Sequence, residues 1–336
     1  MKLLISVLFI INFIGCKGQT NLLLDKEVIL DWSEYPVYSM IIEESAEKNQ
    51  WKNEFKYLDS IELSWITYNS DGLKIKGMMA QPKKNGKYPC IIYNRGGNRD
   101  FGALKVDQRS LNLAKLASHG YIVIASQYRG NGGSEGQEEF GGKDVNDVLN
   151  LMDVLGEIEA ADTTRVGMYG WSRGGMMTYL ALAKSNKIIT AIVGGAVSDI
   201  HQTISERPEM EEKVISQLIP DYQSHKMVEL DKRSAIKWVN KFPKNKPVLM
   251  LHGNADQQVN VTQSIQLAAE FDKSNIPYKL KIFEGGDHSL SQYKIEVNDF
   301  VLDWFGKYLK YGDTNLNMEA WYKDGNVQLV KQKIQK

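Results

Sequence analysis

Ser172 lies between two glycines, Gly170 and Gly174, in the pattern G-x-S-x-G, which is typical of a nucleophilic serine. The pattern alone occurs by chance in about one chain of this size in ten, but here an apolar run at 166–169 precedes it and a helical pattern begins at Arg173. A serine on so tight a strand-to-helix turn needs flanking residues without a Cβ atom, because Cβ atoms would collide there. We therefore predict that Ser172 attacks a carbonyl carbon, with the first amides of the helix facing the negative charge that develops.

A serine hydroxyl becomes a good nucleophile only when a base takes its proton and a third group orients that base. Asp256 follows a buried strand at 248–251, and His288 lies in a glycine loop after an alternating strand at 279–283. Of the five histidines, only His288 lies beyond this candidate acid. The order serine, acid, histidine is the order found in α/β-hydrolases. The sequence therefore predicts a triad of Ser172, Asp256 and His288, brought together by three separate loops.

Several other polar residues have less specific interpretations. Asp287 could orient His288 in place of Asp256, although a neighbour on the same turn usually points elsewhere. His252, which ends the strand before Asp256, is interpreted as a packed histidine that supports the acid turn. Helix-cap, surface or solvated-loop positions are predicted for the remaining candidates, which are His119, His201, His225, Glu138 and Glu139.

The negative oxygen of a tetrahedral intermediate needs two hydrogen-bond donors. One is expected to be the backbone N–H of Arg173, and the other an N–H from the loop after the strand at 88–93. Paired glycines in that loop would let the backbone approach a substrate closely, so Gly97 is predicted as the second donor, with Gly96 or Asn98 as alternatives. The competing interpretation is a simple glycine turn that leaves the strand.

Side chains beside these donors could also line the acyl pocket. Trp171 is a candidate because it precedes the nucleophile, and Arg95 and Arg99 because they flank the paired glycines. Core packing for Trp171 and surface salt bridges for the two arginines are the alternatives. No H-E-x-x-H, C-x-x-C or phosphate-loop pattern occurs, so neither a metal nor an organic cofactor is implied.

The elements that must position these residues alternate along 61–310, which we assign to one catalytic domain. A hairpin at 61–80 is followed by strands at 88–93, 121–127, 165–169, 188–194, 247–252 and 279–283, and by helices at 104–118, 143–158, 173–185, 261–274 and 292–310. This alternation predicts an α/β fold with a mostly parallel sheet covered on both faces, and with ligands at the carboxyl ends of the strands. The stretch 197–240 has no strand pattern and is expected to form a small helical cap above the site.

Composition and charge agree with a single large enzyme domain. The 336 residues suffice for one α/β domain with additions, and 41 basic and 41 acidic residues give a formal net charge of zero. Because no basic stripe is present to neutralise phosphates, nothing favours a nucleic-acid partner.

The N-terminus has the pattern of an export signal. Residues 1–15 combine an early lysine with an apolar run too short to span a bilayer, which is typical of a signal peptide. The run ends at Cys16 in a sequence that resembles a bacterial lipobox. We therefore expect an exported protein, anchored to a membrane by a lipid on Cys16, in the periplasm or at the cell surface; ordinary cleavage a few residues later is the alternative. An extension at 17–60, with a helix expected at 43–57, and a polar tail at 311–336 flank the catalytic domain.

Five segments resemble, in the same order, the catalytic domain of prolyl oligopeptidase-type (S9) serine peptidases: 68–77, 86–97, 128–136, 169–175 and 251–256. The resemblance covers about 60–310 and implies an α/β-hydrolase fold, serine peptidase chemistry and the triad roles given above. Two features depart from the family pattern. The extension is too short for the N-terminal β-propeller that members usually carry, and Arg95-Gly96-Gly97 stands where many relatives have His-Gly-Gly or a tyrosine.

We therefore expect a serine hydrolase that cleaves short peptides through an acyl-enzyme on Ser172. A carboxylesterase with the same triad is the alternative, because ester and amide cleavage differ in leaving-group demands that the sequence does not display. A lipoprotein that keeps the fold and only binds a ligand would be expected to have lost a member of the triad. The expected partners are a small peptide or ester substrate and the membrane, and the oligomeric state stays open.

Overall fold

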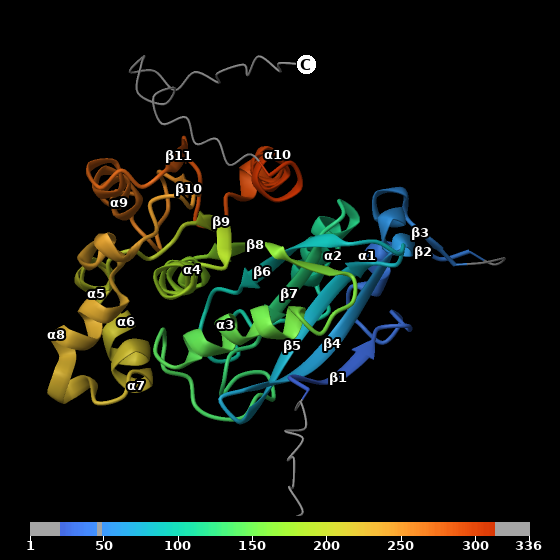
Figure 1. Ribbon diagram of the computed structural model, residues 1–336, viewed down its shortest axis with the longest axis horizontal. Helices are drawn as coiled ribbons and strands as arrows, with labels where there is room; N and C mark the ends of the chain where they lie inside the picture. Colours follow the sequence, from blue (N-terminus) through green and yellow to red (C-terminus); the bar gives the residue numbers. More distant parts are fainter. Residues whose placement is uncertain (1–20, 46–48, 313–336) are drawn as a thin grey trace, which may run out of the picture.

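The computed structural model describes residues 21–45 and 49–312 of the chain. Within these residues, nine strands form the main sheet in the order β1-β4-β5-β7-β6-β8-β9-β10-β11 (Figure 1). Their bounds are β1 (Leu23–Val28), β4 (Ile61–Ser70), β5 (Leu73–Pro82), β6 (Tyr88–Asn94), β7 (Ile122–Ser126), β8 (Ala161–Trp171), β9 (Ile188–Gly194), β10 (Val248–Gly253) and β11 (Tyr278–Phe283). Neighbours from β1 to β7 in this order are antiparallel, and those from β7 to β11 are parallel. The predicted, mostly parallel sheet is confirmed.

Helices cover both faces of the sheet, because parallel strands need crossover connections. One face carries α2 (Gln108–Ser118) and α10 (Lys294–Phe305), and the other α3 (Asp144–Leu155), α4 (Arg173–Lys184) and α9 (Thr262–Lys273). Consecutive strand residues point into opposite cores: Ile91 of β6 is buried with α2 and α10, and Ile92 with α3, α4 and α9. The predicted α/β fold is therefore confirmed, and the helix bounds agree to about one turn.

Between β9 and β10 the chain forms a group of short helices, at the left of Figure 1. They are α5 (Ile200–Glu206), α6 (Pro208–Met210), a π-helical turn (Glu211–Ile215), α7 (Ser216–Leu218) and α8 (Tyr222–Arg233). We call this segment, 200–233, the cap. Arg233 joins it to the rest of the molecule, since its buried guanidinium donates to the carbonyls of Phe140 at 2.8 Å and Glu139 at 2.9 Å.

The N-terminal extension differs from expectation. The predicted helix at 43–57 is wrong: the described residues form α1 (Tyr38–Ile41), a two-stranded ribbon of β2 (Ile42–Glu43) and β3 (Gln50–Trp51), and a 3₁₀ segment (Asn53–Ser60). Tertiary packing overrides the helical propensity here, because Trp51 packs edge-to-face on Trp32 at 5.8 Å and Leu58 is buried in the core. The extension also supplies β1, an edge strand that the sequence did not reveal. Its start is held by the Glu157 carboxylate, which accepts from the amides of Leu22 and Leu23.

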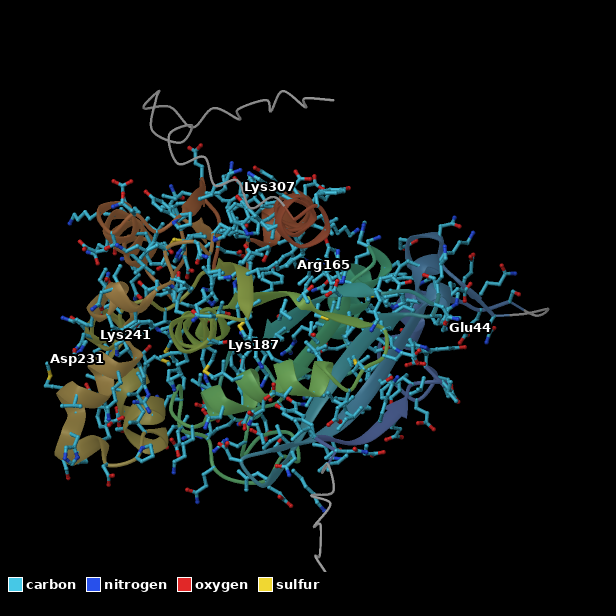
Figure 2. All side chains as sticks on the ribbon, in the orientation of Figure 1. Glu44, Arg165, Lys187, Asp231, Lys241 and Lys307 are labelled. Atoms are coloured by element: carbon cyan, nitrogen blue, oxygen red, sulfur yellow. The ribbon has the colours of Figure 1, made fainter. Side chains whose placement is uncertain are left out.

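Other sequence-based predictions fall on residues that the structure does not describe. The signal segment 1–15, Cys16 and nearly all of the tail at 311–336 are among them. Within 21–45 and 49–312, no helix is both long and apolar enough to cross a lipid bilayer. Glu44, Lys187 and Asp231, labelled in Figure 2, are exposed charged residues from separate parts of the chain.

Candidate active site

Ser172 occupies the sharp turn between β8 and α4. Its backbone has φ 58° and ψ −123°, a conformation that costs energy for a residue other than glycine and that is found mainly at functional sites. A Cβ atom on Gly170 would collide with the Gly174 carbonyl, and one on Gly174 with the Asn94 carbonyl. The prediction that both flanking positions must lack a Cβ atom is confirmed. The Ser172 amide donates to the Gly194 carbonyl at 2.8 Å, which ties the turn to the end of β9.

His288 and Asp256 are joined by a hydrogen bond of 2.7 Å between Nδ1 and Oδ2. His252 Nε2 lies 3.2 Å from the same Oδ2, and the amides of Gln258 and Val259 donate to Oδ1 at 2.7 and 2.9 Å. Burial by itself would raise the pKa of Asp256, but the hydrogen bonds from the two histidines and the Val259 amide outweigh it and hold that pKa well below its ordinary value of 3.8. Asp256 is therefore a carboxylate at neutral pH.

The alternative partner for His288 is excluded by the direction of the Asp287 carboxylate. It accepts from the Ser289 amide at 3.1 Å and from the amide and hydroxyl of Ser291 at 2.8 Å, so it closes its own turn. His252 is fully buried and also contacts Ser264 Oγ through Nδ1 at 2.7 Å. Its predicted role as a packed histidine that supports the acid turn is confirmed.

The nucleophile turn and the histidine loop are in direct contact. Trp171 donates from its indole Nε1 to the His288 carbonyl at 2.7 Å. Gly195, which follows β9, lies against both partners: a Cβ atom there would be 3.1 Å from His288 Nδ1 and 3.2 Å from Asp256 Oδ2. The ends of β8, β9 and β10 and the loop after β11 thus bring the three predicted residues to one edge of the sheet.

Among the described residues, neither Ser172 Oγ nor His288 Nε2 has a hydrogen-bond partner, and the structure contains no bond between them. Hydrogen bonds between nucleophile and base are often long without substrate and tighten when it binds. Because Nδ1 of His288 bonds to a carboxylate, Nδ1 carries the proton of the neutral imidazole. Nε2 then keeps the lone pair that a base needs.

The loop after β6, residues 95–101, lies against the nucleophile turn, and because it contains the predicted donor Gly97 we call it the oxyanion loop. Gly96 is the residue in closest approach, since a Cβ atom on it would lie 3.3 Å from Ser172 Cβ. Gly97 has φ +73°, and its Cβ atom would collide with the Phe101 carbonyl. Within the described part of the chain, the backbone N–H groups of Gly97 and Arg173 donate to no protein acceptor. Both predicted donors are thus unpaired within the described residues, and their role as oxyanion donors stays a prediction.

Arg95 does not line a substrate pocket, contrary to one prediction, and it makes no surface salt bridge either. Its side chain is 1% exposed and donates only to backbone carbonyls, among them that of Gln127 at 2.8 Å. Burial, together with the nearby Arg173 charge, lowers the pKa of Arg95 to about 10, so the group stays cationic at neutral pH. For Trp171 the packing alternative is the one observed, since its ring also meets Tyr169 edge-to-face at 6.4 Å.

Glu138 is the residue that the sequence analysis most misjudged. It was expected in a solvated loop, but its carboxylate is buried and pairs with Arg173. Asp144, at the start of α3, binds the same guanidinium at 2.6 Å. Burial by itself would lower the pKa of Arg173, but the carboxylates of Glu138 and Asp144 outweigh it and raise that pKa above its ordinary value. In the sequence, only the presence of an arginine next to the nucleophile could have indicated such a buried acid. Glu139 is half-buried. In the cap, His225 is exposed as predicted, whereas His201 is half-buried and lies 2.8 Å from Asp231.

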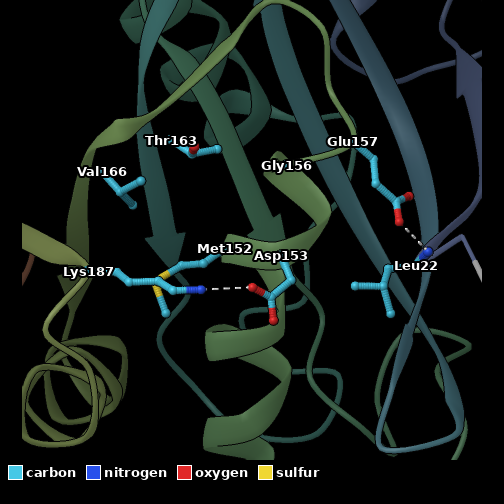
Figure 3. Close-up of a pocket in the computed structure, with 8 residues that line it drawn as sticks. All are labelled: Leu22, Met152, Asp153, Gly156, Glu157, Thr163, Val166 and Lys187. Carbon is cyan, nitrogen blue, oxygen red and sulfur yellow. Dashed lines mark hydrogen bonds and ion pairs between the residues drawn. The ribbon is translucent and has the colours of Figure 1, made fainter. Parts of the chain in front are cut away.

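A cavity of about 540 Å³ lies away from this site, at the other end of β8 (Figure 3). Val166 and Thr163 of β8 line it, together with Leu22 and the ion pair of Lys187 and Asp153 at 3.0 Å. At about 3.3 Å per strand residue, Val166 lies roughly 20 Å from Ser172. This cavity therefore does not belong to the candidate active site.

Comparison with known proteins agrees with this geometry. A sequence model of the prolyl oligopeptidase family matches residues 107–312. The uncharacterized peptidase YtmA of Bacillus subtilis is 31% identical over 218 residues, which are 65% of this chain and 82% of that relative. Dipeptidyl-peptidase 5 of Porphyromonas gingivalis is 24% identical and matches 74% of this chain, but the match spans only 38% of that longer protein.

Solved structures show the same fold. The acylaminoacyl peptidase of Pyrococcus horikoshii, in its orthorhombic crystal form, superposes with a TM-score of 0.66 at 22% sequence identity, over 79% of this chain and 46% of that one. The family match includes Ser172, Asp256 and His288 and covers more than half of the chain. The protein therefore belongs to the prolyl oligopeptidase family of serine peptidases and has its α/β-hydrolase fold.

Proposed function

We propose that this serine peptidase cleaves short peptides through an acyl-enzyme formed on Ser172. The observation that carries the proposal is the hydrogen bond between His288 and Asp256 beside a serine held in a strained turn. Two relatives support a peptide substrate, because one is named a dipeptidyl-peptidase and the other an acylaminoacyl peptidase. The chain spans less than half of these two proteins, so their own substrates are not transferred to it.

In the proposed reaction, His288 Nε2 takes the proton of Ser172 Oγ while Oγ forms a bond to the carbonyl carbon of the substrate. The carbonyl oxygen becomes negative and accepts from the amides of Arg173 and Gly97. The tetrahedral intermediate collapses when the C–N bond breaks and His288 returns the proton to the leaving amine. Water, deprotonated in turn by His288, then releases the acyl group and restores Ser172. Throughout, Asp256 stays ionised and stabilises the imidazolium.

The test compares an aminoacyl amide with an acyl ester of the same acyl group. We expect turnover of both by the native chain, and losses of about 10⁴-fold or more in kcat with Ser172→Ala, as expected when a triad member is removed. A fluorophosphonate should label the native chain and leave the alanine variant unlabelled. Ester turnover without amide cleavage would favour the carboxylesterase alternative, and labelling of the variant would exclude Ser172 as the nucleophile.

We further propose that the protein is exported and anchored to a membrane by a lipid on Cys16. The support is the sequence of residues 1–16, with its early lysine, its short apolar run and its terminal cysteine.

A further inference from the structure

The backbone carbonyls of the oxyanion loop face inward, onto two buried arginines. Arg95 donates from Nη1 to the Gly96 carbonyl at 3.2 Å and to the Phe101 carbonyl at 3.4 Å, and from Nη2 to the Arg99 carbonyl at 3.3 Å. Arg173 donates from Nη1 to the Gly97 carbonyl at 2.9 Å. Four carbonyls within one short loop are therefore held by guanidinium groups.

The position of each carbonyl oxygen determines the direction of the next N–H group in the chain. The C=O of one residue and the N–H of the next point in opposite directions across a trans peptide plane. Because Arg95 holds the Gly96 carbonyl, the Gly97 N–H must point away from that buried guanidinium. Gly96 itself lies beside the nucleophile, because a Cβ atom on it would be 3.3 Å from Ser172 Cβ. The Gly97 N–H therefore lies on the side of the peptide plane opposite Arg95, in a loop that approaches Ser172 at Gly96.

Further contacts fix the two arginines relative to each other. Both guanidinium groups lie over the ring of Tyr128, each 5.0 Å from its centroid. The Tyr128 hydroxyl donates to the Arg95 carbonyl at 3.0 Å. Glu138 pairs with Arg173 through Oε1 and accepts from the Arg99 amide through Oε2 at 2.8 Å, so it links the Arg173 side chain to the oxyanion loop a second time.

We propose that Arg95 and the side chain of Arg173 are positioning residues that hold the Gly97 amide toward Ser172 and so build the oxyanion hole. This inference rests on the proposed function, because only acyl transfer uses that amide. Arg173 thus acts twice: its backbone N–H is one donor, and its side chain positions the other. Arg95 acts only through the loop and does not touch the substrate.

The planar guanidinium of Arg95 is needed because the carbonyls that it binds lie in several directions around it. Arginine presents five N–H donors in a rigid fork, whereas lysine presents a compact charge on a flexible stem. Among the described residues, Arg95 has no carboxylate within ion-pair distance, so its charge is stabilised by these carbonyls. Arg95→Lys should therefore keep the charge and lose the loop geometry.

The experiment measures steady-state kinetics of Arg95→Lys and Arg95→Met with a peptide amide, and inhibition by a peptide aldehyde that forms a tetrahedral adduct. Loss of one oxyanion donor typically costs about 10²- to 10³-fold in kcat. We expect a loss of this order in both variants, a KM within threefold of the native value, and aldehyde binding weakened in parallel with kcat. A purely structural role would lower the melting temperature without this divergence between kcat and KM.

Arg129→Lys is the matched control. Arg129 is also a buried arginine, but it pairs with Asp147 at 2.8 Å and Asp71 at 2.7 Å and makes no bond to the oxyanion loop. Its replacement should lower thermal stability and leave kcat within threefold of the native value.

Hydrogen exchange of the full chain tests, independently of activity, whether Arg95 holds the oxyanion loop in place. Exchange at the Arg99 amide, which donates to Glu138 in the native chain, should be at least tenfold faster in either Arg95 variant and unchanged in Arg129→Lys. If the native chain shows no turnover and no Ser172 labelling, the proposed function fails; faster exchange in the Arg95 variants would then show only that Arg95 orders the loop, and the oxyanion hole would be overturned with the function. A folded Arg95 variant with native kcat, or with native exchange in the loop, would overturn the positioning role and leave the proposed function standing.

Discussion

At the residue scale, the candidate site depends on how Asp256 is kept ionised and immobile. Its two oxygens receive hydrogen bonds from His288 and two backbone amides, and His252 Nε2 lies 3.2 Å from Oδ2. A carboxylate with four such partners can turn only by losing several of them at once. It therefore fixes the ring orientation of His288 and the nitrogen that carries the proton.

Asp256→Asn tests this role, and Asp287→Asn is its matched control on the other side of His288. The asparagine at 256 can present an amide N–H to Nδ1, which favours the wrong tautomer. We expect kcat for a peptide amide to fall about 10⁴-fold, the loss that the same change causes in a serine protease of another fold. Asp287→Asn should stay within threefold, because its carboxylate bonds only to Ser289 and Ser291. Equal losses in the two variants would contradict the assignment of Asp256.

Asp256→Asn should also alter how the free energy of unfolding depends on pH. The pKa of Asp256 is lower in the folded chain than its ordinary value of 3.8, so the folded state releases this proton more readily than the unfolded state. The resulting stabilisation is fully present above that ordinary value and is lost as the pH falls below it. Denaturant unfolding between pH 6 and pH 3 should therefore show a steeper loss of stability in the native chain than in Asp256→Asn.

At the element scale, three strand ends have to meet without steric conflict. Gly195, directly after β9, has φ +46° and separates the nucleophile turn from the pair of Asp256 and His288. Its amide donates to the Leu251 carbonyl at 2.9 Å, so it cannot move without disturbing β10. The sheet thus positions the triad through a residue that takes no part in the chemistry.

Gly195→Ala should lower kcat/KM at least tenfold. The new Cβ atom would lie 3.1 Å from His288 Nδ1 and 3.2 Å from Asp256 Oδ2, which is closer than normal contact and would displace the imidazole. Gly285→Ala is the control, because Gly285 also has a positive φ of 65° in the histidine loop but no atom within 4 Å of its Cβ position. It should cost about 1–2 kcal/mol of stability and leave kcat/KM within threefold. A similar loss of activity in both variants would indicate backbone strain instead of a direct contact.

At the scale of the whole molecule, the start of the described chain and the site lie at different ends of β8. Leu22 lines the same cavity as Thr163 and Val166 of that strand, on the opposite side from Val166 (Figure 3), whereas Ser172 directly follows the last residue of β8. Leu22 follows Cys16, the residue proposed to carry the lipid, by six positions.

Cys16→Ser is expected to change where the protein is found in the cell without changing its activity. If the proposed anchor is correct, the variant moves from the membrane fraction to the soluble fraction. Its kcat for a small peptide amide should stay within threefold, because the site does not depend on residues near Leu22. Membrane fractionation and mass spectrometry of the N-terminal peptide provide the measurement. A variant that remains in the membrane fraction would rule out the anchor at Cys16.

The sequence by itself determined the order of elements, the mostly parallel sheet and the positions of Ser172, Asp256 and His288 at strand ends. These features follow from local patterns: alternating apolar residues, glycines at a tight turn, and polar residues directly after buried strands. The pairing of Asp256 with His288 could be inferred because both residues follow strands whose carboxyl ends lie at the same edge of a parallel sheet.

Only the tertiary structure decided what the buried charges do. Arg95 and Glu138 lie in glycine-rich loops, where the sequence pattern indicates exposure, and their burial depends on partners more than 30 positions away, such as Gln127 and Arg173. The edge strand β1 and the ribbon in the N-terminal extension were missed for the same reason. Long-range contacts supply the hydrogen bonds and apolar surface that make these conformations stable, and no local pattern records them.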